Sequence, residues 1–345
     1  MGFIASAFLH SKSQITQPVE GPSMVIESDS TYSESRGTKK TQQNPKSAQD
    51  SKPLPDLPPE IIHEILLRLP VTSLLQFRSV CKLWCSLIST SQFVKAHLNL
   101  ASKKTDYSHQ KLVFSCIRPD FNLKSCSLLP LLNEQSSNAV EVDYPLKDLH
   151  ESVWILGSCN GLLCIAIGED AVFLWNPSAR KSKKLPCSGV RLRDDSVTIY
   201  GFGYDESIDD YKVVGIFRIV GSGASFETEV KVYTMRTNSW RKIGDFPHGI
   251  PLDDSGTFAN GKLHWAAIAD TGSRYSWVIV SLDLAKETYG EVPQPSYDEG
   301  DSDLTLGVLN GCICVLSHYP GVHADVWIMN EYGRRESWTK LVAIP

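Results

Sequence analysis

The chain has 345 residues, 42% of them hydrophobic, and a formal net charge of −5 at pH 7. This length predicts about two domains with enough apolar material for a sizeable core. The small negative charge argues against a general nucleic-acid or anionic-membrane surface, and no apolar run approaches the roughly eighteen residues of a membrane span. We therefore expect neither nucleic acid nor a membrane among the partners.

Nine cysteines are scattered through the sequence, without a C-x-x-C pair and without a histidine at zinc-finger spacing. An odd number of cysteines without metal-ligand spacing favours buried, reduced thiols over disulfides or a structural zinc site. Reduced thiols are typical of the cytoplasm and the nucleus, so we expect one or both of these locations.

Residues 1–52 form the first segment, in which serine, threonine, glutamine, lysine and proline dominate from Ser11 onward. This composition offers too little apolar surface to offset the entropy that ordering the chain would cost. We expect a disordered leader over residues 1–52.

Residues 53–100 show helical periodicity. Pro58 and Pro59 suit the first turn of a helix, and Pro70 would end it. Three successive apolar groups predict three helices with more apolar surface than about fifty residues can bury internally, so a partner protein is expected. The groups are Ile61, Ile62, Ile65, Leu66 and Leu69, then Leu74 and Leu75, then Val80, Cys81, Leu83, Trp84, Leu87 and Ile88.

The run LPPEIIHEILLRLPVTSLLQFRSVCKLWCSLI resembles an F-box, the motif by which substrate receptors bind the Skp-type adaptor of a cullin-based ubiquitin ligase. Two Leu-Pro pairs, a Leu-Leu pair and a Val-Cys-Lys-x-Trp segment stand in the order and at the spacing of that family. The alternative is an amphipathic helical hairpin that packs on its own downstream domain. The resemblance implies adaptor contacts from Leu57, Pro58, Ile62, Ile65, Leu66, Leu69, Pro70, Leu74, Leu75, Val80, Cys81 and Trp84.

In residues 101–345 the helical period gives way to short apolar runs separated by turn signals, which predicts an all-β domain. The predicted strands are Lys111 to Cys116, Leu162 to Ile167, Ala171 to Trp175, Lys212 to Phe217, Glu229 to Met235, Lys262 to Ala267, Trp277 to Leu282, Cys312 to Ser317 and Asp325 to Met329.

A repeat organises these strands. Three Asn-Gly pairs, which begin at Asn160, Asn260 and Asn310, each lead into an apolar strand and can supply the positive φ values of tight turns. Trp240, Tyr289 and Trp338 follow polar turns at intervals of 49 residues. Units of about fifty residues with several strands are typical of propeller blades, whose aromatic residues would pack between neighbouring blades. We expect four recognisable units and a degenerate first one that begins near Lys111, with the segment around Asp209 as a diverged turn.

Residues 157–345 are similar to the F-box-associated, kelch-like interaction domain of plant F-box proteins, above all at Trp175, Asn176 and Pro177. The implied fold is multi-domain, an N-terminal three-helix F-box (53–100) followed by a kelch-like β-propeller (101–345). Ser182 departs from the pattern because the other repeats place an aromatic residue there. The sequence stops at Pro345, where relatives continue. We therefore expect an incomplete or imperfectly closed ring, and a C-terminal truncation of the chain is one alternative.

The sequence contains no G-x-S-x-G, P-loop or H-E-x-x-H motif, so we predict no catalytic residues and no cofactor. Because kelch-like propellers can house copper oxidases, His264, His318 and His323 are candidate metal ligands. They stand at unrelated repeat positions, and the His-Trp pattern at His264 favours packing within a blade.

Two charged stretches are candidates for contact with a target, because loops at strand ends carry binding in propellers. Their alternative role is that of solvated blade loops. The basic stretch contains Arg180, Lys181, Lys183, Lys184, Arg191 and Arg193, and the acidic loop contains Asp298, Glu299, Asp301 and Asp303.

The family resemblance implies a non-catalytic substrate receptor of an SCF-type ubiquitin ligase, which would bind a Skp-type adaptor, through it a cullin, and an unidentified protein target. Two alternatives remain open. One is a propeller-fold oxidase or hydrolase with a helical appendage, and the other is an adaptor-binding inhibitor that recruits no target.

Overall fold

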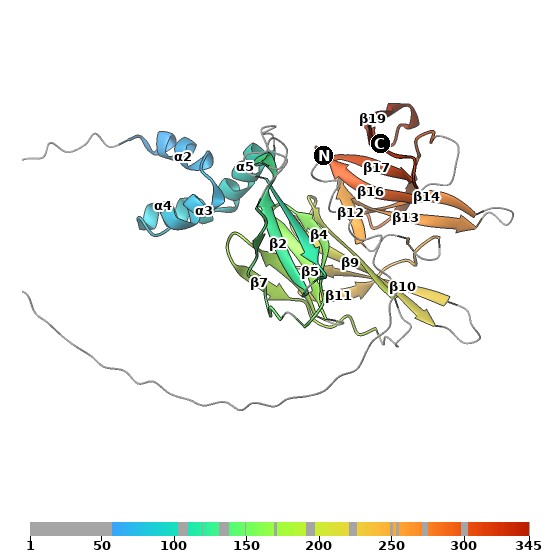
Figure 1. Cartoon of the computed structure of the whole chain (residues 1–345). Coiled ribbons are helices and arrows are strands. Elements are labelled where there is room, and N and C mark those ends of the chain that lie inside the picture. The colour runs from blue at the N-terminus through green and yellow to red at the C-terminus, as the bar shows by residue number, and fades with distance from the viewer. Residues whose placement is uncertain are drawn as a thin grey trace, which may run out of the picture.

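The computed structural model describes residues 57–102, 110–118, 120–130, 138–148, 150–168, 171–190, 197–220, 226–248, 251–252, 255–270, 275–297 and 303–344. The leader predicted for residues 1–52 lies outside these ranges. Figure 1 shows a helical module beside a larger body of β-sheets. The helices come first in the chain, as the sequence predicts.

The helical module has a small core of its own. The fully buried residues are Leu66, Leu74, Ile88 and Phe93. The predicted first helix after Pro58 is confirmed, and Pro70 directly precedes the second helix. The helices are α2 (Pro59–Leu67), α3 (Val71–Phe77), α4 (Lys82–Ser89) and α5 (Ser91–Ser102).

The fourth helix, α5, corrects the expectation of three. Only Thr90 separates it from α4, and Thr90 is extended (φ −72°, ψ 143°). Its side-chain oxygen also accepts a hydrogen bond from the Phe93 N–H at 3.2 Å, which caps the start of α5. Without a proline or glycine at this break, the sequence pattern does not separate the two helices.

The strands form five consecutive blades, a three-stranded one and four of four strands, as the repeat predicts. Within each blade, strands that are consecutive in the chain pair antiparallel. Blade I contains β1 (Lys111–Cys116), β2 (Asn122–Ser127) and β3 (Val140–Glu141), and blade II contains β4 (Val153–Cys159), β5 (Leu162–Ile167), β6 (Ala171–Asn176) and β7 (Lys181–Lys184). Blade III contains β8 (Val197–Asp205), β9 (Asp210–Val220), β10 (Phe226–Thr234) and β11 (Ser239–Lys242). Blade IV contains β12 (Ser255–Ala259), β13 (Lys262–Asp270), β14 (Tyr275–Asp283) and β15 (Tyr289–Val292), and blade V contains β16 (Asp303–Leu309), β17 (Cys312–Tyr319), β18 (His323–Met329) and β19 (Trp338–Ile344).

The turn predictions are confirmed. Asn160, Asn260 and Asn310 have φ near +52°, and the glycine after each also has positive φ, so each pair joins the first two strands of its blade. Asp209 takes the equivalent place in blade III with φ +53°. The segment around Asp209 is therefore the diverged turn that the repeat requires.

The repeated aromatic residues join neighbouring blades, as predicted. Trp240 donates its indole N–H to the Pro186 carbonyl, which follows the last strand of blade II, at 2.8 Å. Tyr289 donates to the carbonyl of Gly244 after blade III, and Trp338 donates to that of Pro293 after blade IV. Ser182 occupies the equivalent place in blade II, where it pairs with Trp175 as Trp240 pairs with Tyr233. A serine there leaves the joint between blades I and II without this aromatic link.

Inner strands of successive blades approach closely where they contain glycine. β8 and β12 pair in parallel at Gly201 and Gly256, which joins blades III and IV into one eight-stranded sheet. A Cβ atom at Gly256 would lie 2.5 Å from the Trp265 ring, so only glycine permits this approach.

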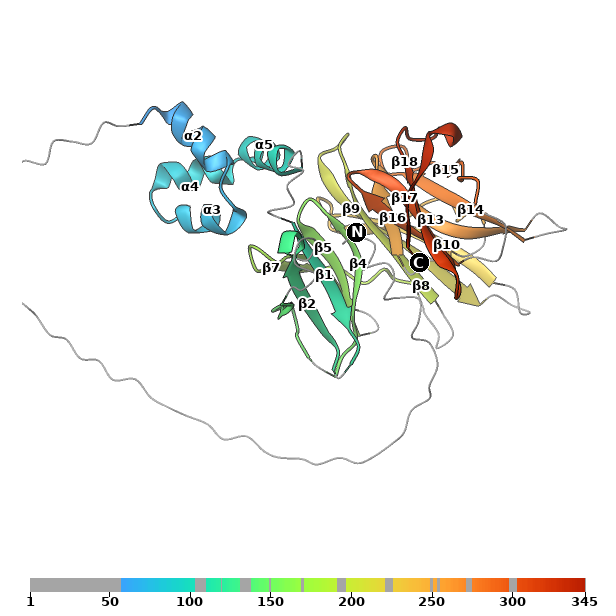
Figure 2. The same cartoon turned by 45° about the horizontal axis from the view of Figure 1, so that its top comes forward.

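Hydrophobic clusters fill the interfaces between blades I and II, II and III, III and IV, and IV and V. Among the described strands, blades I and V share no such interface, so these strands form an arc. Figures 1 and 2 show the arc, with α5 near one of its faces. We call this the near face. Consecutive strands of a blade run in opposite directions. The near face therefore carries the turn between the first and second strands of a blade and the turn between its third and fourth strands. The far face carries the other connections.

Candidate functional site

Helix α2 presents an apolar stripe to solvent. Leu57 lies two residues before the first residue of the helix, and Ile61 and Ile65 stand four residues apart and therefore lie on one side of it. Their exposed fractions are 56%, 47% and 47%. Isolated exposed apolar residues are common, but a group of them at one short helix is typical of a surface that binds a protein.

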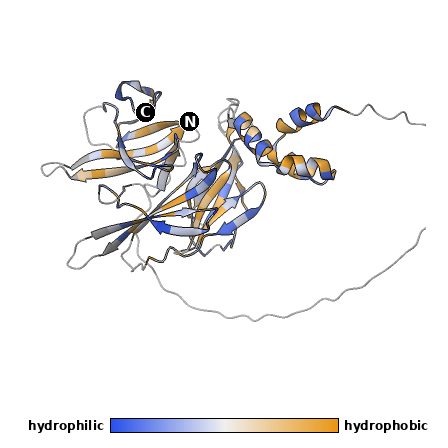
Figure 3. Cartoon of the chain, turned by 180° about the vertical axis from the view of Figure 1, so that it is seen from behind, coloured by the Kyte–Doolittle hydropathy of each residue, from blue (hydrophilic) through white to orange (hydrophobic). Residues whose placement is uncertain are grey.

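Further exposed apolar side chains come from the other helices. Val80, just before α4, and Leu83 within it are 58% and 66% exposed, and Val71 at the start of α3 is also exposed. Figure 3 shows hydrophobic residues along all four helices. A module of this size cannot bury its apolar residues internally, in agreement with the prediction from composition.

The predicted adaptor residues divide into two groups. Leu66 and Leu74 are buried in the core of the module, so they can support a binding surface but not form it. Ile62, Leu69 and Trp84 are partly buried and pack against this core, and Leu75 is also partly buried. The exposed members are Leu57, Pro58, Ile65, Pro70, Val80 and Cys81.

The predicted adaptor set omits five exposed apolar residues of the module, Ile61, Val71, Leu83, Val94 and Leu100. The four-residue spacing of Ile61 and Ile65 contains the signal for Ile61. For the others, periodicity alone does not tell an exposed from a buried apolar position, because neighbouring helices decide which side is covered.

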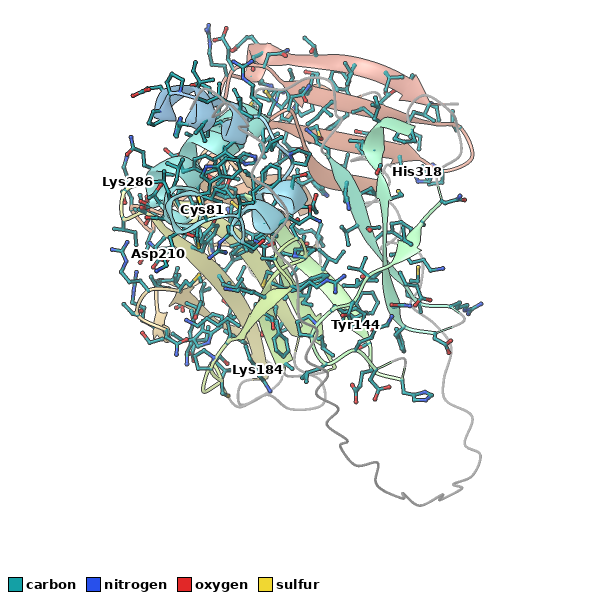
Figure 4. The ribbon with its side chains drawn as sticks, turned by 90° about the vertical axis from the view of Figure 1, so that its left-hand side faces the viewer. Cys81, Tyr144, Lys184, Asp210, Lys286 and His318 are labelled. Atoms are coloured by element: carbon teal, nitrogen blue, oxygen red, sulfur yellow. The ribbon has the colours of Figure 1, made fainter. Side chains whose placement is uncertain are left out.

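The basic stretch does not form one patch. Arg180 lies in the turn between β6 and β7 on the near face, while β7 runs from there toward the far face. Figure 4 shows Asp210 and Lys286 on the side where Cys81 of the helical module lies, and Lys184 away from them. Lys181 and Lys184 are exposed. Arg191, Arg193, Asp298, Glu299 and Asp301 lie outside the described residues, as does the side chain of Asp303.

Lys183 has a structural contact. Its ammonium group donates to the Met235 carbonyl at 3.2 Å and lies 5.9 Å from the centre of the Tyr233 ring. Both partners belong to blade III or its last turn, so Lys183 joins blades II and III. Lys181 and Lys184 of the same strand have exposed side chains.

His264 packs within the propeller, as its sequence pattern predicts. It is fully buried. Its Nδ1 lies 3.1 Å from the Thr257 carbonyl, and its Nε2 lies 2.8 Å from the Tyr332 hydroxyl. Because a carbonyl oxygen only accepts, Nδ1 carries the proton and Nε2 accepts from Tyr332. Both ring nitrogens therefore have protein partners, and the bond to Tyr332 joins blades IV and V.

The other two candidate histidines are not brought together with His264. His318 pairs with Ala324, whereas His323 pairs with Tyr319 and stacks on its ring, so the two histidines point to opposite faces of blade V. Within the described ranges, no cluster of three histidine, cysteine, aspartate or glutamate side chains could hold a metal ion.

All nine cysteines have free thiols. Burial raises the pKa of the Cys159 and Cys314 thiols to about 12, so both are protonated at neutral pH. Burial also raises the pKa of the Cys164 thiol. These thiols therefore behave as small apolar core residues.

Burial of His264 leads to a prediction about acid stability. Burial lowers its pKa to about 4, against 6.5 in the unfolded chain. Between these two values the unfolded state binds the additional proton, so stability falls as pH drops from 6.5 toward 4. The total loss is about 3 kcal/mol, since one pKa unit corresponds to about 1.4 kcal/mol.

Urea unfolding at pH 7, 6, 5 and 4.5 measures this loss. His264→Gln should have a lower free energy of unfolding at pH 7, and this free energy should fall less steeply as the pH drops. Tyr332→Phe keeps the histidine, so its free energy of unfolding should fall with pH as steeply as that of wild type. An equal slope in wild type and His264→Gln would assign the acid sensitivity to other groups.

The sequence matches two protein families. The F-box domain family matches residues 54–95, and the family described as F-box associated beta propeller domain matches residues 113–345. An F-box domain implies binding to a Skp1-type adaptor, and F-box proteins are generally non-catalytic adaptors. Among the described residues, no helix is long and apolar enough to span a bilayer.

Similar proteins include two from Arabidopsis thaliana. The chain is 38% identical to the F-box/kelch-repeat protein At3g23880, over 84% of this chain and 80% of the relative. It is 32% identical to F-box protein CPR1, over 84% of this chain and 73% of that protein. A solved structure, AofleA from Arthrobotrys oligospora, aligns with a TM-score of 0.39 and 12% identity over 68% of this chain and 70% of that one. Together, the helical module, the five blades and the two family matches establish that this chain belongs to the F-box proteins with an F-box-associated beta propeller domain.

Proposed function

We propose that this protein is the substrate-recognition subunit of an SCF-type ubiquitin ligase. The F-box binds a Skp-type adaptor and through it a cullin, and the propeller binds a protein that is then ubiquitinated by the rest of the complex. The receptor itself performs no chemistry. It acts in the cytoplasm, the nucleus or both.

One observation carries the adaptor half of this proposal. The F-box presents the apolar side chains of Leu57, Ile61 and Ile65 to solvent although it has a core of its own. Binding an apolar partner surface removes this area from water and contributes about 25 cal/mol per Å² of buried apolar surface.

The target half rests on the propeller. Its blades form a rigid scaffold with loops at both faces, and such loops carry binding in propellers. We propose that the exposed Lys181 and Lys184 of β7, with the basic segment that contains Arg191 and Arg193, contact an acidic part of the target. The acidic segment from Asp298 to Asp303 is a second proposed contact.

Affinity purification of the full chain tests this function. Cells treated with a proteasome inhibitor should yield the adaptor, the cullin and a ubiquitinated protein with wild type. The variant Leu57→Ala, Ile61→Ala, Ile65→Ala should lose adaptor and cullin but retain the target without ubiquitin. Failure of the wild-type chain to recover an adaptor contradicts the proposal.

Lys181→Glu with Lys184→Glu provides the converse arm. This variant should keep the adaptor and lose the target, because it reverses the charge of the proposed basic contact. Lys242→Glu, which changes an exposed lysine of the equivalent last strand in blade III, is the matched control. Equal target recovery by both variants would place the contact elsewhere on the propeller.

A further inference from the structure

An ion pair joins the F-box to the propeller. Lys95 on α5 places its ammonium nitrogen 2.8 Å from the Oδ2 atom of Asp209. Asp209 lies in the turn between β8 and β9, on the near face of blade III. Both side chains are about half exposed, at 54% and 47%.

The turn that carries Asp209 is held from several directions. The Tyr204 hydroxyl donates to Oδ1 of Asp209, whereas Lys95 pairs with Oδ2. The Arg236 guanidinium donates to the backbone carbonyls of Ile208 at 2.6 Å and Asp209 at 3.3 Å. The Asp209 carboxylate therefore has a defined position before Lys95 reaches it.

Two further features fix this turn to its blade. Asp209 itself has φ +53°, a conformation that aspartate and asparagine tolerate better than most residues. The next residue, Asp210, accepts a hydrogen bond from the Arg236 backbone N–H at 2.8 Å. Arg236 belongs to the turn between β10 and β11, so two turns of blade III support one another at the place where α5 approaches.

We propose that Asp209 is a positioning residue, which sets the direction of the adaptor-binding helices relative to the propeller through its ion pair with Lys95. The inference rests on the proposed function, because in a ligase the direction of the propeller decides where a bound target is held. An exposed ion pair contributes little to folding stability. Its effect is therefore on the distribution of orientations.

The stripe formed by Leu57, Ile61 and Ile65 lies apart from the Lys95–Asp209 ion pair, so the ion pair can be changed without changing the proposed adaptor surface. The stripe lies on α2 and just before it, whereas Lys95 lies on α5. His97 of α5 lies 2.9 Å from the carbonyl of Leu69, two residues after α2, and so holds the two helices together. Since α2 and α5 belong to one packed module, a change at Asp209 should reorient that module without unfolding it.

Zero-length carbodiimide cross-linking of the full chain tests the contact directly. We expect an amide between Lys95 and Asp209 in wild type, identified by mass spectrometry, and its loss in Asp209→Asn. The exposed pair of Lys242 and Asp245, 3.9 Å apart within blade III, is the internal control and should react in both proteins. A wild-type chain that forms the control cross-link but not the Lys95 one overturns the proposal.

Small-angle X-ray scattering tests the effect on orientation. Asp209→Asn preserves the tolerated backbone conformation, and Lys95→Gln removes the other charge. Each should shift the profile toward larger dimensions at low salt, and the double variant should shift it no further than either single one, because all three remove the same contact. Wild type should approach the variants as salt is raised, while the variants should not respond.

The control variant Lys242→Gln should match the wild-type scattering profile at every salt concentration. Scattering profiles of Asp209→Asn and Lys95→Gln that coincide with wild type at low salt would overturn the positioning role. Adaptor co-purification is measured on the same proteins and should be unchanged. A wild-type chain that binds no adaptor, yet shows the cross-link and the salt response, would contradict the proposed function. The positioning role of the Lys95–Asp209 ion pair would still stand.

Discussion

Truncation of Leu57, Ile61 and Ile65 to alanine should weaken adaptor binding by about 30- to 700-fold. Full burial of a leucine or isoleucine contributes about 1.5 to 3 kcal/mol, and these side chains have about half of their surface left to bury. Three of them together amount to about 2 to 4 kcal/mol, and each 1.4 kcal/mol corresponds to a tenfold change in affinity. Alanine is a good helix former, so α2 should remain folded. Titration of the purified adaptor by isothermal calorimetry measures the change.

Two control variants separate binding from folding. Leu341→Ala removes an equally exposed leucine from β19 of blade V, which is 53% exposed, and should leave adaptor affinity unchanged. Leu66→Ala removes a buried core residue and should destabilise the F-box by about 2 to 5 kcal/mol. If the triple variant binds as tightly as wild type, the adaptor surface does not include this face of α2.

Replacing Lys212 with methionine should destabilise the propeller by about 3 to 5 kcal/mol. Its ammonium nitrogen lies 2.8 Å from Oδ2 of Asp205 and 3.0 Å from Oε1 of Glu287, and all but a few per cent of the lysine is buried. It also donates to the Leu284 carbonyl, which follows β14 in blade IV. The lysine thus joins blades III and IV, and its removal leaves the buried Asp205 carboxylate without a counter-charge.

Chemical unfolding of the variant, compared with wild type, measures this effect. Burial raises the pKa of Asp205, but hydrogen bonds from Lys212 and Ser207 outweigh it and hold the pKa below its ordinary value, so the carboxylate is charged at neutral pH. Adding Asp205→Asn to Lys212→Met should therefore recover part of the lost stability, because no buried charge remains unpaired. Lys242→Met, which removes an exposed lysine, is the control and should change stability by less than about 1 kcal/mol. No recovery in the double variant would mean that Asp205 is not the group that Lys212 stabilises.

Ten strands were not predicted from the sequence, and five of them lack a local strand signal for two physical reasons. β7, β11 and β15 are outer strands of only four residues, too short to show the apolar alternation that identifies a strand. β8 and β12 are inner strands, whose glycines at Gly201, Gly203 and Gly256 lower their local preference for a strand. Contacts with neighbouring blades supply the order that these segments lack by themselves.

The sequence by itself determined the features that depend on a few neighbouring residues. The Asn-Gly turns follow from the backbone freedom of two adjacent residues, and the 49-residue interval of Trp240, Tyr289 and Trp338 reflects one hydrogen bond repeated between blades. The F-box could likewise be identified from the order of its prolines and apolar residues. Each of these signals is local or repeats at a constant spacing.

Only the tertiary structure decided which apolar and charged residues face a partner. Ile65 and Leu66 are adjacent and equally apolar, yet Phe93 of α5 and Leu74 of α3 share the core with Leu66 and leave Ile65 half exposed. Lys183 and Lys184 are adjacent lysines, but only Lys183 is held by blade III. Lys212 and Glu287 are far apart in the chain, and so are Lys95 and Asp209. Pattern and composition do not encode such pairs, because contact between distant segments depends on how the whole chain folds.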